Sequence, residues 1–396
     1  MTTRREFIAG LTAGAATAIA CDTSPRDKEE IPELSFGSAR GESTIFGRTG
    51  IRTSRIGFGA AHFTTNKTKE EATRLVHTIL DEGINLIDTA WNYGKDMASW
   101  RYLGEVFKDR KRDDFIISNK LEWREGRPEI TEKSVEEQID EALAILNVDY
   151  FDIYHIHNLY ESGCYEKCVD KGFIEDMIPM REKGKIRYLG ISGHSHPDMI
   201  SMCKRYPEID VVLGGMNIMR EYYYFDYDAR HLNDYAKRNN LGILSMKPFL
   251  MGALTRNQPA ALKYAMTQPN SVPIPGMTEI EHVTMNVKAA REFSALSPEA
   301  QQSWKDPETI LEQPACTGCK YCINGDSDDI NVPQLVMAAQ YGERFGLRKW
   351  QSKDQRRKKL AGDLKKITPI MAGRYARKCP RELPVEELLK KSAQYI

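Results

Sequence analysis

The fold class follows from residues 131–158, which read TEKSVEEQIDEALAILNVDYFDIYHIHN. In the first part, Thr131–Leu146, apolar residues recur at steps of three and four, which predicts an amphipathic helix. In the second part, Phe151–Asn158, aromatic and β-branched residues predominate, which predicts a strand. Alternation of this kind is typical of parallel sheets, so we expect this stretch to be one unit of a parallel α/β fold.

The same alternation continues on both sides, with further amphipathic segments at Lys69–Glu82 and Tyr227–Asn239. Seven more strand-like runs accompany them: Arg55–Ala61, Asn85–Tyr93, Phe115–Leu121, Arg187–Gly193, Val211–Asn217, Gly242–Pro248 and Ser271–Gly276. Eight units over about 230 residues predict an α/β fold of the (β/α)8 TIM-barrel type. An open doubly wound sheet is the alternative, but no GxGxxG motif follows the first strand, which disfavours it. A hairpin at residues 44–53 is expected to plug the barrel floor.

The composition is that of an ordinary globular protein, and it excludes several classes. The chain has 396 residues, of which 41% are hydrophobic and 28% charged, and its 56 Lys and Arg balance 56 Asp and Glu. Because there is no basic excess, we expect no nucleic-acid partner. No run of 18 apolar residues occurs, which excludes a multi-pass membrane protein. We place the barrel at residues 43–292, which leaves an N-terminal segment, 1–42, and a C-terminal segment, 293–396.

The N-terminal segment has the pattern of an export signal. The pair Arg4-Arg5 precedes an Ala- and Gly-rich stretch at residues 9–20, and small residues lead up to Cys21. The paired arginines resemble a twin-arginine signal, so we predict a signal peptide at residues 1–20 and a linker at 21–42. This predicts export by the twin-arginine machinery to the periplasm or the outer face of the cytoplasmic membrane. Two alternatives stay open: a lipid anchor at Cys21, which is the one membrane attachment we expect, and a disordered basic N-terminus.

Ionisable residues stand at the ends of three neighbouring predicted strands. Asp88 and Tyr93 end the second strand, Lys120 ends the third and His157 ends the fourth. Because active sites of (β/α)8 barrels lie at the carboxyl ends of the strands, we expect the four side chains to converge. A carboxylate offsets the charge of a nearby ammonium, and an ammonium lowers the pKa of a nearby phenol. A phenol tuned in this way can pass a proton to a carbonyl oxygen. Taken singly, each residue also has an ordinary structural interpretation, such as a helix cap or a core histidine.

On these residues and their surroundings, the sequence resembles the aldo-keto reductase family over residues 43–290. The segments that carry the resemblance are Gly47–Gly50, Ile84–Gly94, Ile117–Lys120, Tyr150–His157, Gly184–Ser192, Lys247-Pro248 and Gly276–Asn286. The resemblance implies a barrel in which a nicotinamide cofactor, NADP or NAD, exchanges hydride with a small carbonyl compound or sugar. It further implies that Tyr93 is the proton donor, that Lys120 lowers its pKa, that Asp88 pairs with Lys120 and that His157 orients the carbonyl.

The resemblance also assigns cofactor-binding residues. They are Ser192, Asn217, Lys247, Leu250, Gly252, Leu254, Gly276, Met277, Thr278, His282 and Asn286. Backbone N–H groups among them are expected to take the pyrophosphate. Three positions at which the family holds the nicotinamide carry Gly193, Leu213 and Met216 instead. His282 stands where the family has an Arg, which would grip a 2′-phosphate better than a neutral His, so the choice between NADP and NAD stays open.

The C-terminal segment carries a metal-binding pattern. Cys316, Cys319 and Cys322 form a C-x2-C-x2-C run, and Cys379, which precedes a proline, follows 57 residues later. Four thiolates can hold one [4Fe–4S] cluster, and the segment resembles the ferredoxin-like tail of some aldo-keto reductases. A structural zinc site and a disulfide pairing are the alternatives. The other barrel cysteines are expected to be ordinary thiols: Cys164, Cys168 and Cys203.

Together these features predict an exported oxidoreductase of aldo-keto reductase type with one [4Fe–4S] cluster. A [4Fe–4S] cluster transfers one electron at a time, whereas a nicotinamide transfers a hydride, so the two cannot exchange electrons directly. We therefore favour a structural or pocket-covering role for the cluster. An electron-transfer partner is expected only if the cluster passes electrons. The alternative from another class is a non-catalytic or electron-transfer barrel protein that has lost nicotinamide binding.

Overall fold

The computed structural model describes most of the chain beyond residue 42. The described residues are 43–124, 128–160, 163–215, 217–218, 229–252, 254–293, 297, 299, 307–326, 329–346 and 355–396. The predicted signal peptide, the linker with Cys21, and Met216 lie outside these ranges. Among the described residues, no helix combines the length and the apolar character that crossing a membrane requires.

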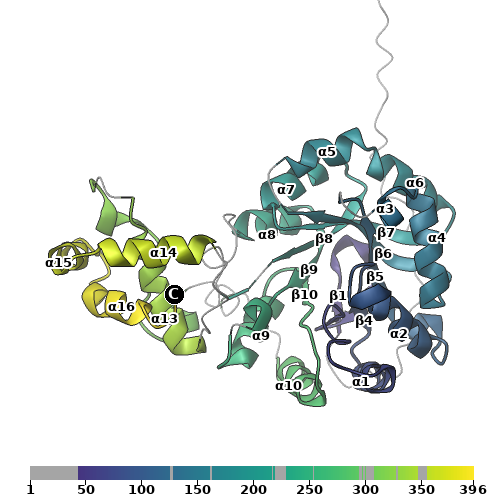
Figure 1. Ribbon diagram of the computed structural model, residues 1–396, viewed down its shortest axis with the longest axis horizontal. Coiled ribbons are helices and arrows are strands. Elements are labelled where there is room, and N and C mark those ends of the chain that lie inside the picture. Colours follow the sequence, from purple (N-terminus) through teal and green to yellow (C-terminus); the bar gives the residue numbers. More distant parts are fainter. Residues whose placement is uncertain are drawn as a thin grey trace, which may run out of the picture. The chain divides into compact units, whose positions relative to one another are not determined.

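Eight parallel strands form one sheet whose strand order follows the sequence (Figure 1). They are β3 (Phe58–Gly59), β4 (Leu86–Asp88), β5 (Ile116–Glu122), β6 (Phe151–Leu159), β7 (Ile186–Gly193), β8 (Ile209–Gly215), β9 (Gly242–Met246) and β10 (Ser271–Pro273). The first and last strands also meet, because the amides of Gly57 and Gly59 donate to the carbonyls of Pro273 and Pro275 at 2.8 and 3.1 Å. The predicted (β/α)8 barrel is therefore confirmed, and the open sheet is not what the chain forms.

Helices follow the strands along the chain (Figure 1). They are α1 (Lys69–Asp81), α2 (Ala98–Phe107), α3 (Pro128–Thr131), α4 (Val135–Leu146), α5 (Cys164–Asp170), α6 (Phe173–Glu182), α7 (His196–Arg205), α8 (Ala229–Arg238), α9 (Gln258–Met266) and α10 (Ile280–Arg291). Capping boxes begin two of them: Thr68 with Glu71 at α1, and Ser134 with Glu137 at α4. Such reciprocal bonds satisfy the free amides of a first helical turn, which explains why these helices begin where they do.

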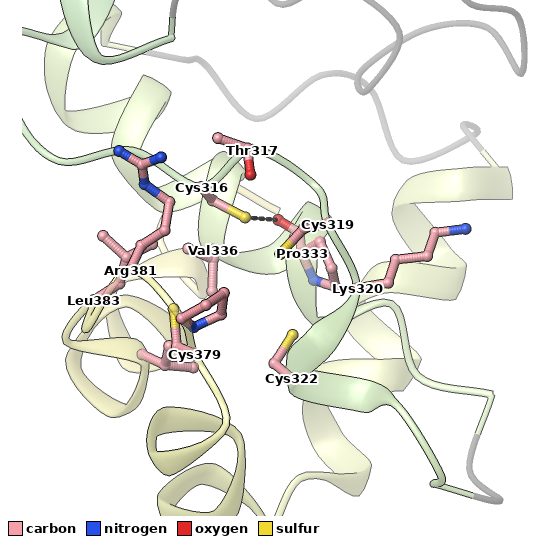
Figure 2. Close-up of a pocket in the computed structure, with 12 residues that line it drawn as sticks. Cys316, Thr317, Cys319, Lys320, Cys322, Pro333, Val336, Cys379, Arg381 and Leu383 are labelled. Carbon is pink, nitrogen blue, oxygen red and sulfur yellow. Dashed lines mark hydrogen bonds between the residues drawn. The ribbon is translucent and has the colours of Figure 1, made fainter.

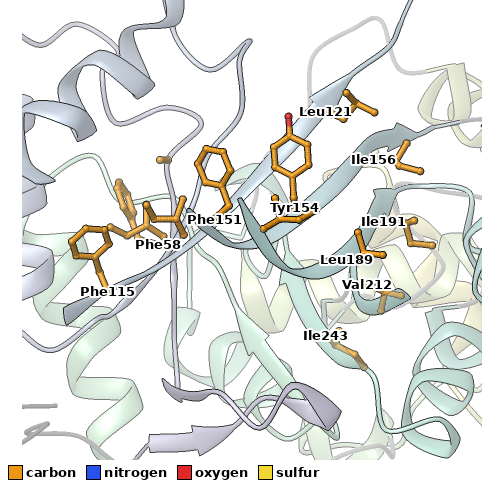
Figure 3. Packing of buried hydrophobic residues seen from close by; sticks show 14 of the residues in the cluster. Phe58, Phe115, Leu121, Phe151, Tyr154, Ile156, Leu189, Ile191, Val212 and Ile243 are labelled. Carbon is orange, nitrogen blue, oxygen red and sulfur yellow. The ribbon is translucent and has the colours of Figure 1, made fainter. Parts of the chain in front are cut away.

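Side chains alternate along the strands between two apolar layers. Ile117 is fully buried in the larger layer, together with Tyr154 and Ile156 (Figure 3). The same layer holds most of the buried apolar residues of α1, α2, α4 and α6. Ile116 and Ile153, one position away on β5 and β6, belong to a smaller cluster inside the barrel. Successive strand residues point to opposite faces, so every second position of β5 and β6 is an interior position.

The hairpin ahead of the barrel plugs it as predicted. β1 (Ser43–Ile45) and β2 (Arg52–Ser54) pair antiparallel around a 3-10 turn at Gly47–Thr49. Phe46 in this hairpin is completely buried in the interior cluster. A Cβ at Gly242, the first residue of β9, would lie 2.7 Å from the Phe46 ring, so only glycine admits the plug there.

The C-terminal segment is helical. Its elements are α12 (Pro307–Leu311), a 3-10 turn η5 (Tyr321–Ile323), α13 (Val332–Phe345), α14 (Gln355–Lys366), α15 (Pro369–Arg377) and α16 (Val385–Ser392). Leu335 and Leu389 are among the buried residues of a separate small core, in which α13 packs on α16. A helical segment outside the barrel therefore exists as predicted.

Candidate active site

A buried ion pair lies at the carboxyl ends of β4 and β5. The ammonium of Lys120 donates to Oδ1 and Oδ2 of Asp88, both at 2.7 Å, and to the carbonyl of Thr89 at 2.8 Å. These contacts use all three hydrogens of the ammonium. Burial raises the pKa of Asp88 and lowers that of Lys120, and the bonds between the two groups oppose both shifts. The pair therefore holds Lys120 in one position at the barrel mouth.

Tyr93 stands over this ion pair. The chain leaves β4 after Asp88, and a turn closed by the amide of Tyr93 on the carbonyl of Ala90 carries the phenol back, which is why β4 is shorter than predicted. The ammonium of Lys120 lies 4.9 Å from the centroid of the Tyr93 ring. Burial and the charge of Asp88 nevertheless raise the pKa of Tyr93 well above its usual value. The lowering of this pKa expected from Lys120 is not seen, and the cation that does lower it is Arg124.

His157 completes the group from β6. Its ring meets the Tyr93 ring edge to face, with centroids 6.4 Å apart and an interplanar angle of 85°. Burial lowers the pKa of His157 to about 4, although the nearby Glu122 opposes that shift. The imidazole is therefore neutral at neutral pH. The structure thus brings together all four residues that the strand ends predict.

Sequence reasoning missed a second set of polar residues on the same strands. Ser118 and Glu122 alternate with Lys120 on β5, and His155 precedes His157 by two positions on β6. The hydroxyl of Ser118 donates to Oδ1 of Asp88 at 2.7 Å, and Nε2 of His155 lies 3.0 Å from that hydroxyl. The signal that could have found them is the period of two, since polar residues follow Ile116 and Ile153 at successive interior positions of both strands.

Two residues at the ends of β7 and β9 add a charged group to the mouth. The ammonium of Lys247 lies 3.3 Å from Nε2 of His194. Burial lowers the pKa of Lys247 to about 8 and that of His194 to about 2. Near them, the Ser192 hydroxyl donates to the carbonyl of Ile156 at 3.2 Å, and Asn217 is buried just beyond β8. Sequence reasoning singled out Lys247, Ser192 and Asn217 but not His194.

Gly193 departs from the family's amide-bearing residue for a steric reason. A Cβ at this position would lie 2.4 Å from the carbonyl oxygen of Leu159. The same oxygen accepts hydrogen bonds from the amides of His194 and Ser195, at 2.7 and 2.8 Å, so it is held firmly in place. Leu213, the second departure, is buried in the apolar interior cluster. Neither position offers a side-chain amide to a ligand.

The segment from β10 into α10 begins with exposed backbone at Gly276 and ends with the buried side-chain amide of Asn286. Gly276 is exposed, and a Cβ there would meet only the carbonyl of Gly59, at 3.8 Å. Met277 is buried, whereas the exposed Nδ1 of His282 lies 3.3 Å from both the amide and the hydroxyl of Thr278. Asn286 is 1% exposed, and neither its amide nitrogen nor its amide oxygen has a hydrogen-bond partner among the described residues.

The segment after β9 contains three more of the assigned residues. Leu250 and Gly252 bound a 3-10 turn in which Leu250 and Met251 both have positive φ, at 51° and 56°. Leu250 and Leu254 are buried in an apolar cluster with Ala261 of α9. Their side chains therefore serve packing, and only their backbone groups can meet a ligand.

The four cysteines of the C-terminal segment line one pocket (Figure 2). Cys316 and Cys322 come from the C-x2-C-x2-C run and Cys379 follows α15, with Pro333 and Val336 of α13 forming the apolar side. Burial, with an added contribution from the other three cysteines, raises the pKa of the Cys316 thiol to about 11. Among the described residues, no group of three or more His, Cys, Asp or Glu side chains is close enough to hold a single metal ion.

Asp326 joins the two cysteine segments. It stands where a ferredoxin-type run would have its fourth cysteine, and its carboxylate pairs with Arg374 and Lys378, each at 3.2 Å. Both cations lie within five residues of Cys379, so these pairs hold Cys379 close to the C-x2-C-x2-C run. All seven cysteines among the described residues are free thiols, and Cys164, Cys168 and Cys203 are buried as expected.

This fold and this site define a class, the (β/α)8 oxidoreductases with an Asp–Lys–Tyr–His group at the barrel mouth. The chain belongs to the aldo/keto reductase family, whose family model matches residues 55–260, and it is an oxidoreductase of that family. It is 26% identical over 311 residues to L-galactose dehydrogenase of Arabidopsis thaliana, a match that covers 68% of this chain and 94% of the relative.

Solved structures share the fold. An aldo-keto reductase from Bacillus halodurans, in its holo form, superposes with a TM-score of 0.57 at 21% identity, covering 69% of this chain and 96% of the other. An aldo-keto reductase from Klebsiella pneumoniae in complex with NADPH gives a TM-score of 0.53 at 19% identity, covering 67% and 94%.

Proposed function

We propose that the chain interconverts a small carbonyl compound and its alcohol, with a sugar as the favoured substrate, and that it uses NADP or NAD. The observation that carries this proposal is the convergence of Tyr93 and His157 over the buried Lys120–Asp88 pair. A bound nicotinamide would supply or accept the hydride. The sugar preference rests on the similarity to a protein named L-galactose dehydrogenase.

Each residue has a distinct part in the chemistry. The hydroxyl of Tyr93 is protonated at neutral pH and is therefore the group that can give a proton to a carbonyl oxygen, although its raised pKa opposes the transfer. Lys120, fixed by Asp88 and Thr89, holds its ammonium 4.9 Å from the centroid of the Tyr93 ring and so helps to position the phenol. His157, neutral and buried, orients the substrate oxygen.

The residues present fit a nicotinamide dinucleotide in part. The buried amide of Asn286, with no protein partner among the described residues, can bond to polar atoms of a ligand. Lys247 with His194 offers positive charge for a phosphate, and the open backbone at Gly276 allows a ligand to approach closely. Gly193 and Leu213 provide no clamp for a carboxamide, so the nicotinamide end would be held mainly by shape and backbone.

Replacement of Tyr93 by Phe tests the activity. We expect kcat to fall by about 100-fold or more, because the proton donor is lost, while the affinity for NADPH measured by fluorescence titration stays the same. Tyr150→Phe is the matched control, since its hydroxyl makes only an exposed hydrogen bond to Asp113. Unchanged turnover in Tyr93→Phe, or no binding of NADPH or NADH by the wild-type protein, would favour the non-catalytic alternative.

We also propose that Cys316, Cys319, Cys322 and Cys379 hold one [4Fe–4S] cluster. The support is the donor set itself, four thiols on one pocket, with Asp326 tying their two segments together. We favour a structural role for the cluster, which would bond α15 to the C-x2-C-x2-C run. Electron transfer to a partner protein is the second role, and a reversible redox potential with turnover supported by reduced cluster would favour it.

Iron and sulfide analysis of anaerobically purified protein tests the cluster. We expect about four of each per chain, with most of the iron lost in Cys379→Ser and none lost in Cys203→Ala, whose thiol is buried in the barrel. Stoichiometric zinc without sulfide would overturn the proposal in favour of the structural zinc site.

Export by the twin-arginine route is a further proposal, supported by Arg4-Arg5 and the Ala-rich stretch before Cys21. Cell fractionation of the full chain should find it outside the cytoplasm, whereas the double variant Arg4→Lys, Arg5→Lys should accumulate inside. Labelling with palmitate, in comparison with Cys21→Ala, decides whether a lipid anchor is added.

A further inference from the structure

A carboxylate beside His157 has no place in the four-residue group described above. Glu122 is the last residue of β5, and its side chain is 1% exposed. Its Oε2 lies 3.6 Å from Nδ1 of His157. The proposed function assigns the other ring nitrogen of His157, Nε2, to the substrate. The inference below concerns what this neighbour does to His157, and it rests on the proposed carbonyl–alcohol chemistry.

Glu122 is held as a fixed negative charge by donors that include two backbone amides and the guanidinium of Arg124. Its Oε1 accepts from the amides of Trp123 and Arg124, both at 3.2 Å, and from Nε of Arg124 at 2.8 Å. Its Oε2 accepts from Nη2 of Arg124 at 2.6 Å. Burial raises the pKa of Glu122, but the bonds from Arg124 and the nearby His157 outweigh burial and leave the pKa well below its usual range. The carboxylate is therefore ionised throughout the neutral range.

A neutral imidazole carries one N–H, and its surroundings decide which nitrogen bears it. The charged groups around His157 are the carboxylate of Glu122 and the cations of Lys120 and Arg124. The two cations oppose a charged imidazolium, and the carboxylate attracts the single proton to the nitrogen that faces it, Nδ1. Nε2 is then left with a lone pair.

We infer that Glu122 fixes His157 as the Nδ1–H tautomer, so that Nε2 accepts a hydrogen bond from a substrate hydroxyl. The two redox forms of one substrate differ at this atom. The alcohol offers an O–H donor to Nε2, whereas the carbonyl offers only lone pairs, which Nε2 repels. The site therefore binds the alcohol form better than the carbonyl form, and Glu122 is a positioning residue that acts through His157.

Nitrogen-15 NMR of the imidazoles tests the tautomer without any assay of activity. Long-range couplings from the ring carbons' protons separate a protonated from an unprotonated ring nitrogen, and the signals of His157 are those lost in His157→Gln. We expect Nδ1 to be protonated in the wild-type protein and Nε2 to be protonated in Glu122→Gln, whose amide can donate to Nδ1. An Nε2–H tautomer in the wild-type protein would overturn the inference.

Arg124→Gln is the matched control for the loss of the ion pair. It removes the guanidinium but keeps the carboxylate of Glu122 beside His157, where two backbone amides still hold it. The Nδ1–H tautomer should therefore persist in this variant. If Arg124→Gln and Glu122→Gln change the tautomer alike, the carboxylate is not the cause, and the inference fails.

Kinetics then connect the tautomer to the substrate. In Glu122→Gln we expect KM for the alcohol to rise about tenfold and KM for the matching carbonyl to fall or stay level, because Nε2 now donates. Equal changes in both constants would mean a purely structural role and would contradict the inference. If the NMR result holds but the wild-type protein turns over no alcohol or carbonyl, the proposed function fails while the tautomer assignment stands.

Discussion

The hydroxyl of Ser118 donates a 2.7 Å hydrogen bond to Oδ1 of Asp88, the same oxygen that receives the ammonium of Lys120. Nε2 of His155 lies 3.0 Å from that hydroxyl, and none of these four side chains is more than 3% exposed. Because Ser118 donates to Asp88, it must accept from His155, which assigns the proton of His155 to Nε2. The Asp88–Lys120 ion pair is thus held by side chains inside the barrel as well as by the carbonyl of Thr89.

Removing the Ser118 hydroxyl should weaken this support. In Ser118→Ala we expect the free energy of unfolding to fall by about 1–3 kcal/mol, because the N–H of His155 is left buried without a partner. Urea denaturation measures the loss. Ser43→Ala, which removes an exposed hydroxyl that accepts from Arg52, should change stability by less than about 0.5 kcal/mol. If the free energy of unfolding falls equally in both variants, the buried hydrogen bond of Ser118 contributes no more to stability than the exposed one of Ser43.

The buried, neutral His157 should make the fold sensitive to acid. Its pKa is about 4 in the folded protein, against about 6.5 in an unfolded chain, so the unfolded state binds more protons between these pH values. The free energy of unfolding should therefore fall as pH drops from about 6.5 to 4, by up to about 3 kcal/mol from this residue. Urea titrations across this range should show a shallower fall in His157→Gln. A slope identical to that of the wild-type protein would contradict the low pKa.

Restoring the family's residue at Gly193 should harm the protein. In Gly193→Asn the new Cβ would lie 2.4 Å from the carbonyl of Leu159, so the strand must shift, at a cost of about 1–3 kcal/mol. We expect a lower Tm and no gain in affinity for NADPH. Gly215→Ala, at the end of β8, meets nothing within 4 Å and is the control. Tighter NADPH binding in Gly193→Asn would show that the strand adapts.

The buried amide of Asn286 should cost stability in exchange for ligand binding. In Asn286→Leu we expect the free energy of unfolding without ligand to rise by about 1 kcal/mol or more, because two unpaired polar atoms disappear. The Kd for NADPH should rise about tenfold, since the ligand loses its partner. Thermal denaturation and fluorescence titration measure the two effects. A variant that is less stable and binds NADPH normally would mean that Asn286 serves the fold alone.

Most of the barrel could be predicted because its alternation of strands and amphipathic helices produces local sequence patterns. All eight strands occur where runs such as Phe115–Leu121 and Phe151–Asn158 place them, and the plug occurs at the hairpin. The ends of the strands were less predictable. The run Asn85–Tyr93 becomes a strand of three residues followed by a turn, because the chain must leave the sheet to bring Tyr93 over Lys120.

The sequence by itself determined the barrel, the four residues at its mouth and the four cysteines, since periodicity, strand ends and spacing are all local properties. Only the tertiary structure decided which groups of the site are ionised and where their protons lie. Asp88 pairs with Lys120 and raises the pKa of Tyr93, and Glu122 lies beside His157 on the neighbouring strand. Such pKa shifts and tautomers depend on burial and on distances between residues far apart in the chain, and neither quantity is contained in a local pattern.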